Sequence, residues 1–468
     1  MQPVTPHSSF AGAVWPAIPS PPAAALLSIL HQLEQTEKFS EAEIEEVRRP
    51  QLIELIRHAV RNSAYWKGRF NAAGITRLIE KGHRIEAAEW SERWLSLPIL
   101  TRPDVQELGE DLVICDLPKG HGQISEIVTS GSSGQPVRIS RSTLDHLYWQ
   151  AFQLRAHAWR ERDLSGTFLS ILRDEQRPSS GESIHLRRMD DWGAPVATVW
   201  PTGPSVLLDY RASTADLIAA IREISPDYIC TFPSLLLEIL RVARDEELAM
   251  PAVREVITVS EACPPGLREL CREVLGAAMS STYSAAECGG IATQCMEGNW
   301  HAQSERMVVE ILDDNGRPSG AGTTGRVILT PLHNFAMPLF RYEIGDLATV
   351  GSEPCRCGRE LPVIAHIPGR ARDLLMLPSG EMRPPYYGHN AVMEVRSIRQ
   401  HQVVQTSPTG ICLRLVVAKP LTAEEENFIL TKVDAALENR FEVSIEYAES
   451  IQRQPSGKYA EFERCFSL

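Results

Sequence analysis

One stretch rich in serine and glycine holds the first residues that could do chemistry. It reads TSGSSGQP from Thr129 to Pro136, so hydroxyls and glycines follow one another through it. Such a stretch could be a flexible linker between domains, or a loop whose N–H groups and hydroxyls close around a phosphate. It lacks the Gly-Lys-Ser/Thr ending of a Walker loop, which excludes the common P-loop NTPases.

Four further segments place polar side chains where a nucleotide could use them. In STYSAAECGG, Tyr283 follows a predicted strand and can stack on a base, while Glu287 can hold Mg²⁺ through hard oxygen atoms. In FRYEIGD, Asp346 stands at a turn and can accept hydrogen bonds from sugar hydroxyls. HIPGRARD places Arg370 after a glycine, and PSGK places Lys458 near the C-terminus. Taken alone, such a segment is more often an ordinary loop with a core tyrosine or a solvated turn residue.

Two sulfur-rich segments offer a different chemistry. Cys355 and Cys357 stand one residue apart in PCRCG, and QCMEGNWH supplies Cys295 and His301. Four N and S ligands suit tetrahedral zinc in a closed, structural site, although the spacing is not that of a standard zinc finger. Cys288 is a competing ligand, or a small buried residue. An ordinary turn is the alternative to a zinc site.

The segments around these residues predict the elements that position them. Ile124, Ile127, Val137 and Ile139 flank the serine-rich stretch with β-forming residues, which favours a hairpin loop over a linker. Helical and strand patterns then alternate from residue 143 to about 300, which predicts α/β layers with a largely parallel sheet. Before them, apolar residues at helical spacing predict two or three helices, interrupted near Pro50.

Composition limits the class of protein. With 468 residues the chain is too long for one core, and 43% hydrophobic with 23% charged residues is typical of a soluble globular protein. A net charge of −13 argues against nucleic-acid binding. Ten cysteines without a secretion signal indicate reduced thiols and a cytoplasmic location. No stretch is apolar and long enough to cross a membrane, and residues 1–28 form a Pro-rich, loosely ordered lead-in.

Together and in this order, the segments resemble the adenylate-forming superfamily, and within it the phenylacetate–CoA ligase-like branch. TSGSSGQP resembles the phosphate loop, VSEACP the segment that borders adenine, TYSAAE the Tyr/acid motif, and FRYEIGD the ribose motif. PGRARD resembles the hinge, PSGK the motif of the catalytic lysine, and CRCGR an element typical of the branch. The resemblance implies a large multi-layer α/β adenylation domain (1–368), a hinge (369–373) and a small, mobile α+β domain (374–468).

The resemblance also implies roles for individual residues. The implied ATP and AMP ligands are Thr129, Ser130, Gly131, Ser132, Ser133, Gly134, Ser260, Glu261, Thr282, Tyr283, Ser284, Asp346 and Arg370. The implied catalytic residues are Lys458, Glu287 and Thr282, and Glu287 would also bind Mg²⁺. Matching Cys and His positions in some members of the branch support Zn²⁺ at Cys295, His301, Cys355 and Cys357. Candidate pocket residues are Trp149, Phe152, Phe232, Cys288, Gly289, Phe335 and Met337, each of which could instead be plain core.

Three places depart from the family's pattern. Gln135 stands where relatives often have Lys, and Arg372 stands where the hinge usually has its acid, which follows only at Asp373. After the hinge, LPSGEMRPPYYGHNAV does not match the family's usual run near the acceptor site. The sequence therefore predicts the adenylation step better than it predicts the pivot residue of the hinge or the acceptor of the second step.

Three functions follow from this pattern. The first is an ATP- and Mg²⁺-dependent ligase that converts an aryl carboxylic acid to acyl-AMP and then to an acyl-CoA, in aromatic degradation or secondary metabolism. The second keeps the adenylation step but transfers the acyl group to an amine or a carrier-protein thiol. The third is a catalytically silent nucleotide- or zinc-binding scaffold. A homodimer is an open possibility for the assembly.

Overall fold

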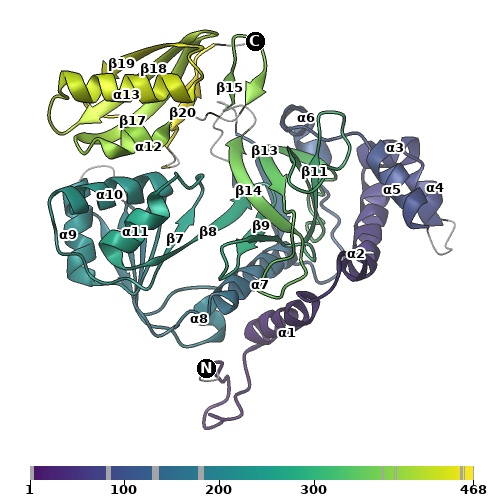
Figure 1. Cartoon of the computed structure of the whole chain (residues 1–468). Helices are drawn as coiled ribbons and strands as arrows, with labels where there is room; N and C mark the ends of the chain where they lie inside the picture. Colours follow the sequence, from purple (N-terminus) through teal and green to yellow (C-terminus); the bar gives the residue numbers. More distant parts are fainter. Residues whose placement is uncertain are drawn as a thin grey trace. The chain divides into compact units, whose positions relative to one another are not determined.

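The computed structural model describes residues 5–80, 86–128, 136–177, 184–370, 374–383, 385, 387–453, 457 and 459–466. The chain forms two compact units, each built from separate segments (Figure 1). Unit 1 comprises Met1–Leu164, Gly193–Pro201 and Thr282–Ile367, and unit 2 comprises Ser165–Trp192, Thr202–Ser281 and Pro368–Leu468. Strand β8 (Ala278–Ala285) begins in unit 2 and ends in unit 1.

The helices of unit 1 precede most of its strands. They are α1 (Pro21–Thr36), α2 (Glu41–Asn62), α3 (Ala64–Ala72), α4 (Ile75–Glu80), α5 (Ala87–Ser96), α6 (Arg102–Leu108), the 3₁₀ turn η1 (Gly109–Leu112), α7 (Thr143–Trp159) and α8 (Val196–Val199). Helix α2 starts at a capping box, in which Ser40 and Glu43 satisfy each other's backbone N–H groups.

Two predictions about this region are corrected. The lead-in predicted to reach residue 28 ends at Ser20, because two prolines start α1 at Pro21 and the helix buries one apolar stripe that includes Leu26 and Leu30. The predicted interruption near Pro50 is absent from α2, which runs through that residue. Burial of residues such as Leu55 holds this helix together despite the missing N–H of the proline.

The strands of unit 1 form an antiparallel arrangement. They are β9 (Gly289–Gln294), β10 (Trp300–Ala302), β11 (Met307–Leu312), β12 (Thr324–Pro331), β13 (Tyr342–Val350) and β14 (Val363–Arg370), and with β8 they follow the order β11-β12-β13-β14-β10-β9-β8. A separate hairpin pairs β1 (Ile124–Val128) with β2 (Arg138–Ser142), with Val128 opposite Arg138. The prediction of a hairpin around the serine-rich loop is therefore confirmed.

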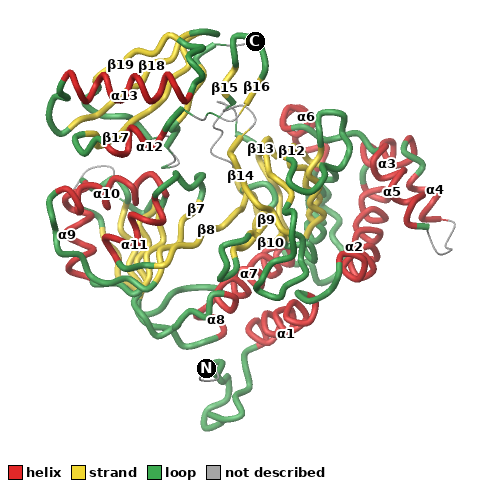
Figure 2. Tube along the Cα trace, viewed as in Figure 1, coloured by secondary structure: helices red, strands yellow, loops and turns green. Residues whose placement is uncertain are grey.

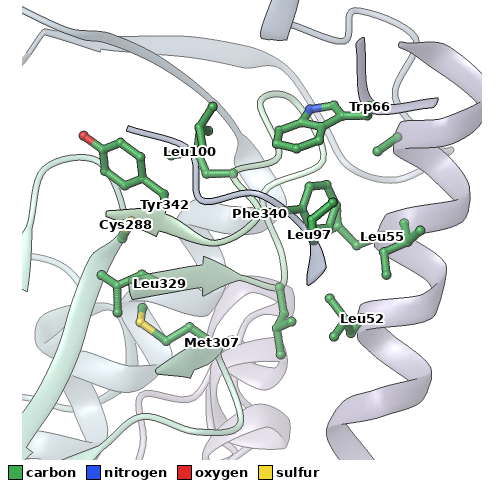
Figure 3. Packing of buried hydrophobic residues seen from close by; sticks show 14 of the residues in the cluster. Leu52, Leu55, Trp66, Leu97, Leu100, Cys288, Met307, Leu329, Phe340 and Tyr342 are labelled. Atoms are coloured by element: carbon green, nitrogen blue, oxygen red, sulfur yellow. The ribbon is translucent and has the colours of Figure 1, made fainter. Parts of the chain in front are cut away.

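The core of unit 1 joins its helices to its strands. Leu52 and Leu55 of α2 lie at one side of this cluster, and Cys288 and Tyr342 lie at the other (Figure 3). Trp66 lies between them and meets Phe340 edge to face, with ring centroids 4.8 Å apart. Aromatic pairs of this kind add to the stabilisation that burial alone gives.

The first part of unit 2 has the alternating α/β pattern that the sequence predicts. Strands β3 (Phe168–Leu172), β5 (Ser205–Asp209), β6 (Tyr228–Thr231) and β7 (Glu255–Val259) are parallel, and β4 (Leu186–Met189) is antiparallel at the edge. Helices α9 (Thr214–Ile224), α10 (Pro233–Asp245) and α11 (Leu267–Leu275) lie beside these strands (Figure 2). Their buried apolar residues share one core with those of the strands. The order is β7-β6-β3-β5-β4.

The C-terminal part of unit 2 is a small α+β body. Its elements are β15 (Leu375–Met376), β16 (Met382–Arg383), α12 (His389–Glu394), β17 (Ile398–Ser407), β18 (Gly410–Val417), α13 (Ala423–Ala436), β19 (Glu442–Tyr447) and β20 (Phe462–Arg464). The sheet order is β19-β18-β17-β20, and Thr422 caps α13. The predicted fold class, a larger α/β part followed by a smaller α+β part, is confirmed. Among the described residues, none of the helices is both long and apolar enough for a membrane span.

Candidate functional site

Two predicted nucleotide residues meet in unit 1. Tyr283 lies in the second half of β8, and Asp346 lies in β13. The Tyr283 hydroxyl donates a hydrogen bond to Oδ2 of Asp346 over 2.9 Å. The Tyr283 ring is 8% exposed and stands edge-on to Trp300, with ring centroids 6.3 Å apart. The bond thus brings together two residues that stand 63 positions apart in sequence and were both predicted to bind adenosine.

The predicted magnesium ligand forms an ion pair. Glu287 lies in the turn between β8 and β9, and its Oε1 accepts a hydrogen bond from Nη1 of Arg102 at 2.8 Å. The Glu287 side chain is 10% exposed. One carboxylate beside bound phosphates is a usual magnesium environment, so the residue fits the ion. An ion here would share the carboxylate with the arginine.

Arg102 is a residue of this site that the sequence did not reveal. Thr101 caps α6, and Asp104 returns the bond to the Thr101 N–H, so Arg102 occupies the first position of the helix. This capping box was the available signal. Its partner Glu287 lies 185 positions away, which no local pattern indicates.

The turn that carries Glu287 is anchored through its backbone. Nη2 of Arg141 donates to the carbonyl of Ala286 at 2.6 Å, and Nη1 of Arg306 donates to the carbonyl of Cys288 at 2.6 Å. Both guanidinium groups also pair with Asp145 of α7, at 3.6 and 3.3 Å. Because these groups are buried, the carbonyls and Asp145 replace the water that the arginines lose.

A second network lies in unit 2 and contains Glu261. Its carboxylate accepts the backbone N–H groups of Ser234 and Tyr459, at 3.1 and 2.6 Å. Burial raises the pKa of Glu261, and these hydrogen bonds oppose the rise. Nη1 of Arg453 donates to Oγ of Ser234 at 2.6 Å and to the carbonyl of Gly457 at 3.3 Å. The network therefore joins the start of α10 to the residues on either side of position 458.

The other residues predicted to bind the nucleotide differ in location and exposure, and some lie outside the described residues. Thr282 and Ser284 are exposed on β8, Ser260 follows β7 with a left-handed φ of 70°, and Arg370 ends β14 half-buried. The structure does not describe residues 129–135, 371–373 or 458. The phosphate-loop ligands Thr129 to Gly134, the hinge and Lys458 therefore stay predictions.

The candidate pocket residues are buried or half-buried. In unit 1, Trp149 stacks near His146, Phe152 lies under the guanidinium of Arg155, and Phe335 lies between the rings of His58 and His121. Met337 and Cys288 are 1% exposed and belong to the core cluster. Gly289 has a φ of +78°, and a Cβ there would approach Arg306 to 2.6 Å. Phe232 belongs to unit 2, where it contacts Tyr210 and Gly457.

The four predicted zinc ligands converge in unit 1. Their donor atoms all lie within 4.8 Å of one another. Sγ of Cys295 lies 3.6 Å from Sγ of Cys355, and Sγ of Cys357 lies 3.3 Å from Nε2 of His301. The other ring nitrogen of His301 lies 3.0 Å from the carbonyl of Leu361, which fixes the tautomer that leaves Nε2 free for a metal. The cysteines are free thiols, and this set fits tetrahedral zinc.

Family models match two parts of the chain. The model described as "AMP-binding enzyme" matches residues 198–334, and the model described as "CapK C-terminal domain" matches residues 385–462. The first range contains Glu261, Tyr283 and Glu287, and the second contains Lys458.

Individual relatives agree with these models. The phenylacetate-coenzyme A ligase of Aromatoleum evansii is 23% identical over 74% of both chains. The phenylacetate-coenzyme A ligase of Thermus thermophilus is 28% identical over 34% of this chain, and the match spans 38% of that relative's length. A crystal structure of 2-hydroxyisobutyryl-CoA ligase in the postadenylation state superposes with a TM-score of 0.68, at 17% identity, over 92% of this chain and 91% of the other.

Proposed function

Because the chain belongs to the adenylate-forming superfamily, on its CoA-ligase branch, we propose that it is an AMP-forming acid–CoA ligase. In the first step a carboxylate attacks the α-phosphate of ATP, giving acyl-AMP and pyrophosphate. In the second step the thiol of CoA attacks the acyl carbon, giving the thioester and AMP. The observation that carries this proposal is the hydrogen bond between Tyr283 and Asp346, the two residues assigned to adenosine.

Different residues of the chain would have different roles in the first step. Tyr283 lies by the adenine, Asp346 and Arg370 hold the ribose hydroxyls, and Lys458 bridges the carboxylate and the α-phosphate. The transition state concentrates negative charge on the phosphate, and positioned donors stabilise that charge more than they stabilise the ground state. Loss of one such donor typically costs about 10²–10³ in rate.

The phosphate loop and Glu287 would hold the leaving group. Ser130, Ser132, Ser133 and the glycine N–H groups bind the β- and γ-phosphates, and Thr282 completes the set assigned to catalysis. Magnesium bound by Glu287 would neutralise phosphate charge. The ion pair with Arg102 supports this role, because it holds the Glu287 carboxylate in place in a site that is largely shielded from water.

Zinc would be structural. Cys295, His301, Cys355 and Cys357 would fill its four positions, which leaves none for water or substrate. The ion would tie β9 and β10 to the loop before β14, close to strands that carry the adenosine residues.

The acid is proposed to be an aryl carboxylate. The two curated relatives are phenylacetate-coenzyme A ligases, and apolar or aromatic residues dominate the candidate pocket. The domain organisation is part of the proposal: residues 369–373 form the hinge about which residues 374–468 rotate between the two steps, carrying Lys458 away so that CoA can enter.

Pyrophosphate release tests the proposal. The chain is incubated with ATP and Mg²⁺ and with phenylacetate, ring-substituted benzoates or short aliphatic acids, each with and without CoA. We expect release that needs an aryl acid and turns over only with CoA. Acid-dependent release that does not respond to CoA would instead support an amine or carrier-protein acceptor. Silence across the panel would leave either an acid outside the panel or the inactive scaffold. Lys458→Ala should abolish adenylation and largely spare thioester formation from supplied acyl-AMP; equal loss of both would contradict the rotation.

A further inference from the structure

Four side chains of the C-terminal part of unit 2 converge on one point outside the proposed active site. His389 starts α12, His401 lies in β17, Glu461 precedes β20, and Tyr387 comes from the run after the hinge that departs from the family's pattern. Nδ1 of His389 lies 2.6 Å from Oε1 of Glu461, and Nε2 of His401 lies 3.3 Å from the same oxygen. The Tyr387 hydroxyl also donates to this oxygen.

The spacing of these atoms suits a tetrahedral metal ion. Ligand atoms about 2.0–2.1 Å from zinc stand roughly 3.3 Å apart along the edges of the tetrahedron. The Tyr387 hydroxyl lies 3.2 Å from Nε2 of His401 and 3.3 Å from Nδ1 of His389. Nε2 of His401 lies 3.3 Å from Oε1 of Glu461. The closer approaches of His389 and of the Tyr387 hydroxyl to Glu461 would both have to open when an ion enters. Cys357 and His301, in the proposed zinc site, are separated by a similar 3.3 Å.

The surroundings permit a metal to enter. Tyr387, His389 and His401 are 5%, 6% and 4% exposed, while the Glu461 side chain is 32% exposed and so gives a route from solvent. A cavity of about 30 Å³ adjoins His401 and Glu461, which is enough for a water molecule. Arg241, Arg399 and Arg453 line the same cavity and oppose a cation, so the affinity should be below that of the cysteine site.

We propose that His389, His401 and Glu461 bind a second Zn²⁺ ion, with the Tyr387 hydroxyl at the fourth position. Two imidazole nitrogens with one carboxylate favour zinc over the hard cations calcium and magnesium. The ion would fasten the start of α12 to β17 and to a residue only three positions after Lys458. This role explains the unusual run after the hinge, and it does not depend on the proposed reaction.

The competing explanation is a carboxylate satisfied by hydrogen bonds alone. In that case Glu461 accepts from Tyr387 and from both histidines, and no ion is needed. The two explanations differ in the number of metal ions that the whole chain holds and in the ligands of the second ion.

Metal content and cobalt spectroscopy on the full chain distinguish them. The protein is loaded with Zn²⁺ and analysed by mass spectrometry, then stripped and titrated with Co²⁺. We expect two equivalents, of which only the first gives a sulfur-to-cobalt charge-transfer band. His389→Gln should weaken binding of the second equivalent by more than about 100-fold and leave that band unchanged. A loss of this size exceeds the usual range for a residue that only hydrogen-bonds a metal ligand. His31→Gln, at an exposed histidine of α1, is the matched control.

Cys355→Ser completes the design, because it should weaken the first equivalent and its band, through loss of one of three sulfur ligands, and keep the second equivalent. If circular dichroism shows that His389→Gln is misfolded, Glu461→Gln replaces it with the same expectation. A single equivalent in the unaltered chain, lost with Cys355→Ser, would overturn the proposal. A metal content that neither the His389 nor the Glu461 variant changes would also overturn it.

Discussion

Replacing Glu261 with glutamine should separate the two half-reactions. The Glu261 carboxylate binds two buried N–H groups, and one of them belongs to Tyr459, the residue after Lys458. Glutamine has nearly the same shape but only one acceptor atom, and its amide N–H₂ would face the second donor. The substitution therefore makes the remaining hydrogen bond a neutral one and leaves the second backbone N–H without its acceptor.

The expected slowing of adenylation can be worked out from the hydrogen bonds that Glu261 accepts. A hydrogen bond to a charged group contributes about 1.5–3 kcal/mol, so losing one from the Glu261 network should cost about 2–3 kcal/mol. At 1.4 kcal/mol per tenfold, adenylation should slow by about 30- to 150-fold if the network positions the residues around Lys458 for that step. Thioester formation from supplied acyl-AMP should change little if the proposed rotation withdraws Lys458 in that step.

Isotope exchange between pyrophosphate and ATP measures the first step, and thioester formation from synthetic acyl-AMP measures the second. Glu246→Gln is the control, since Glu246 is exposed at the end of the same helix, α10. Urea unfolding reports on overall stability. An equal fall in both half-reactions, or no fall in adenylation, would refute the reasoning.

Three further outcomes are expected. Tyr283→Phe removes the hydrogen bond to Asp346 and should raise the KM for ATP about tenfold, with a smaller change in kcat, in steady-state assays. Gly289→Ala forces a left-handed φ and a clash with the guanidinium of Arg306, so urea unfolding should show a loss of about 1–3 kcal/mol. Burial lowers the pKa of His333 in the folded chain to about 3, whereas in the unfolded chain it is about 6.5. Below about pH 6.5 the unfolded chain therefore binds a proton that the folded chain does not, and stability falls as the pH drops. His333→Gln should reduce that slope by about 1.4 kcal/mol per pH unit, measured by urea unfolding at a series of pH values.

Local patterns predicted the parts of the fold that depend on neighbouring residues. The hairpin follows from β-forming residues on both sides of a Ser/Gly loop, and Thr422 caps α13 because a hydroxyl and Glu425 stand three apart. The predicted interruption at Pro50 was wrong, because burial of one face of α2 in the tertiary structure outweighs the hydrogen bond that the proline cannot make.

The candidate site was predictable only where chemistry restricts the residue types. Cys295 and His301 could be paired with Cys355 and Cys357 because few groups bind zinc. The bond between Arg102 and Glu287, and the bond between Glu261 and the N–H of Tyr459, have no such signal. Arginine and glutamate are common on any surface, and the partners lie 185 and 198 positions apart.

The turn that carries Glu287 is held by its own carbonyl groups. Arg141 and Arg306 donate hydrogen bonds to the backbone carbonyls of Ala286 and Cys288. Every amino acid has this carbonyl, so the bonds do not require a particular side chain. These two bonds do not depend on the side chain at Ala286, which is exposed, so that residue can be exchanged without releasing the turn, provided that Gly289 is kept. Cys288 is 1% exposed in the core, so its own packing adds a constraint at that position. The surface of the turn can therefore change while the backbone beside Glu287 stays where it is.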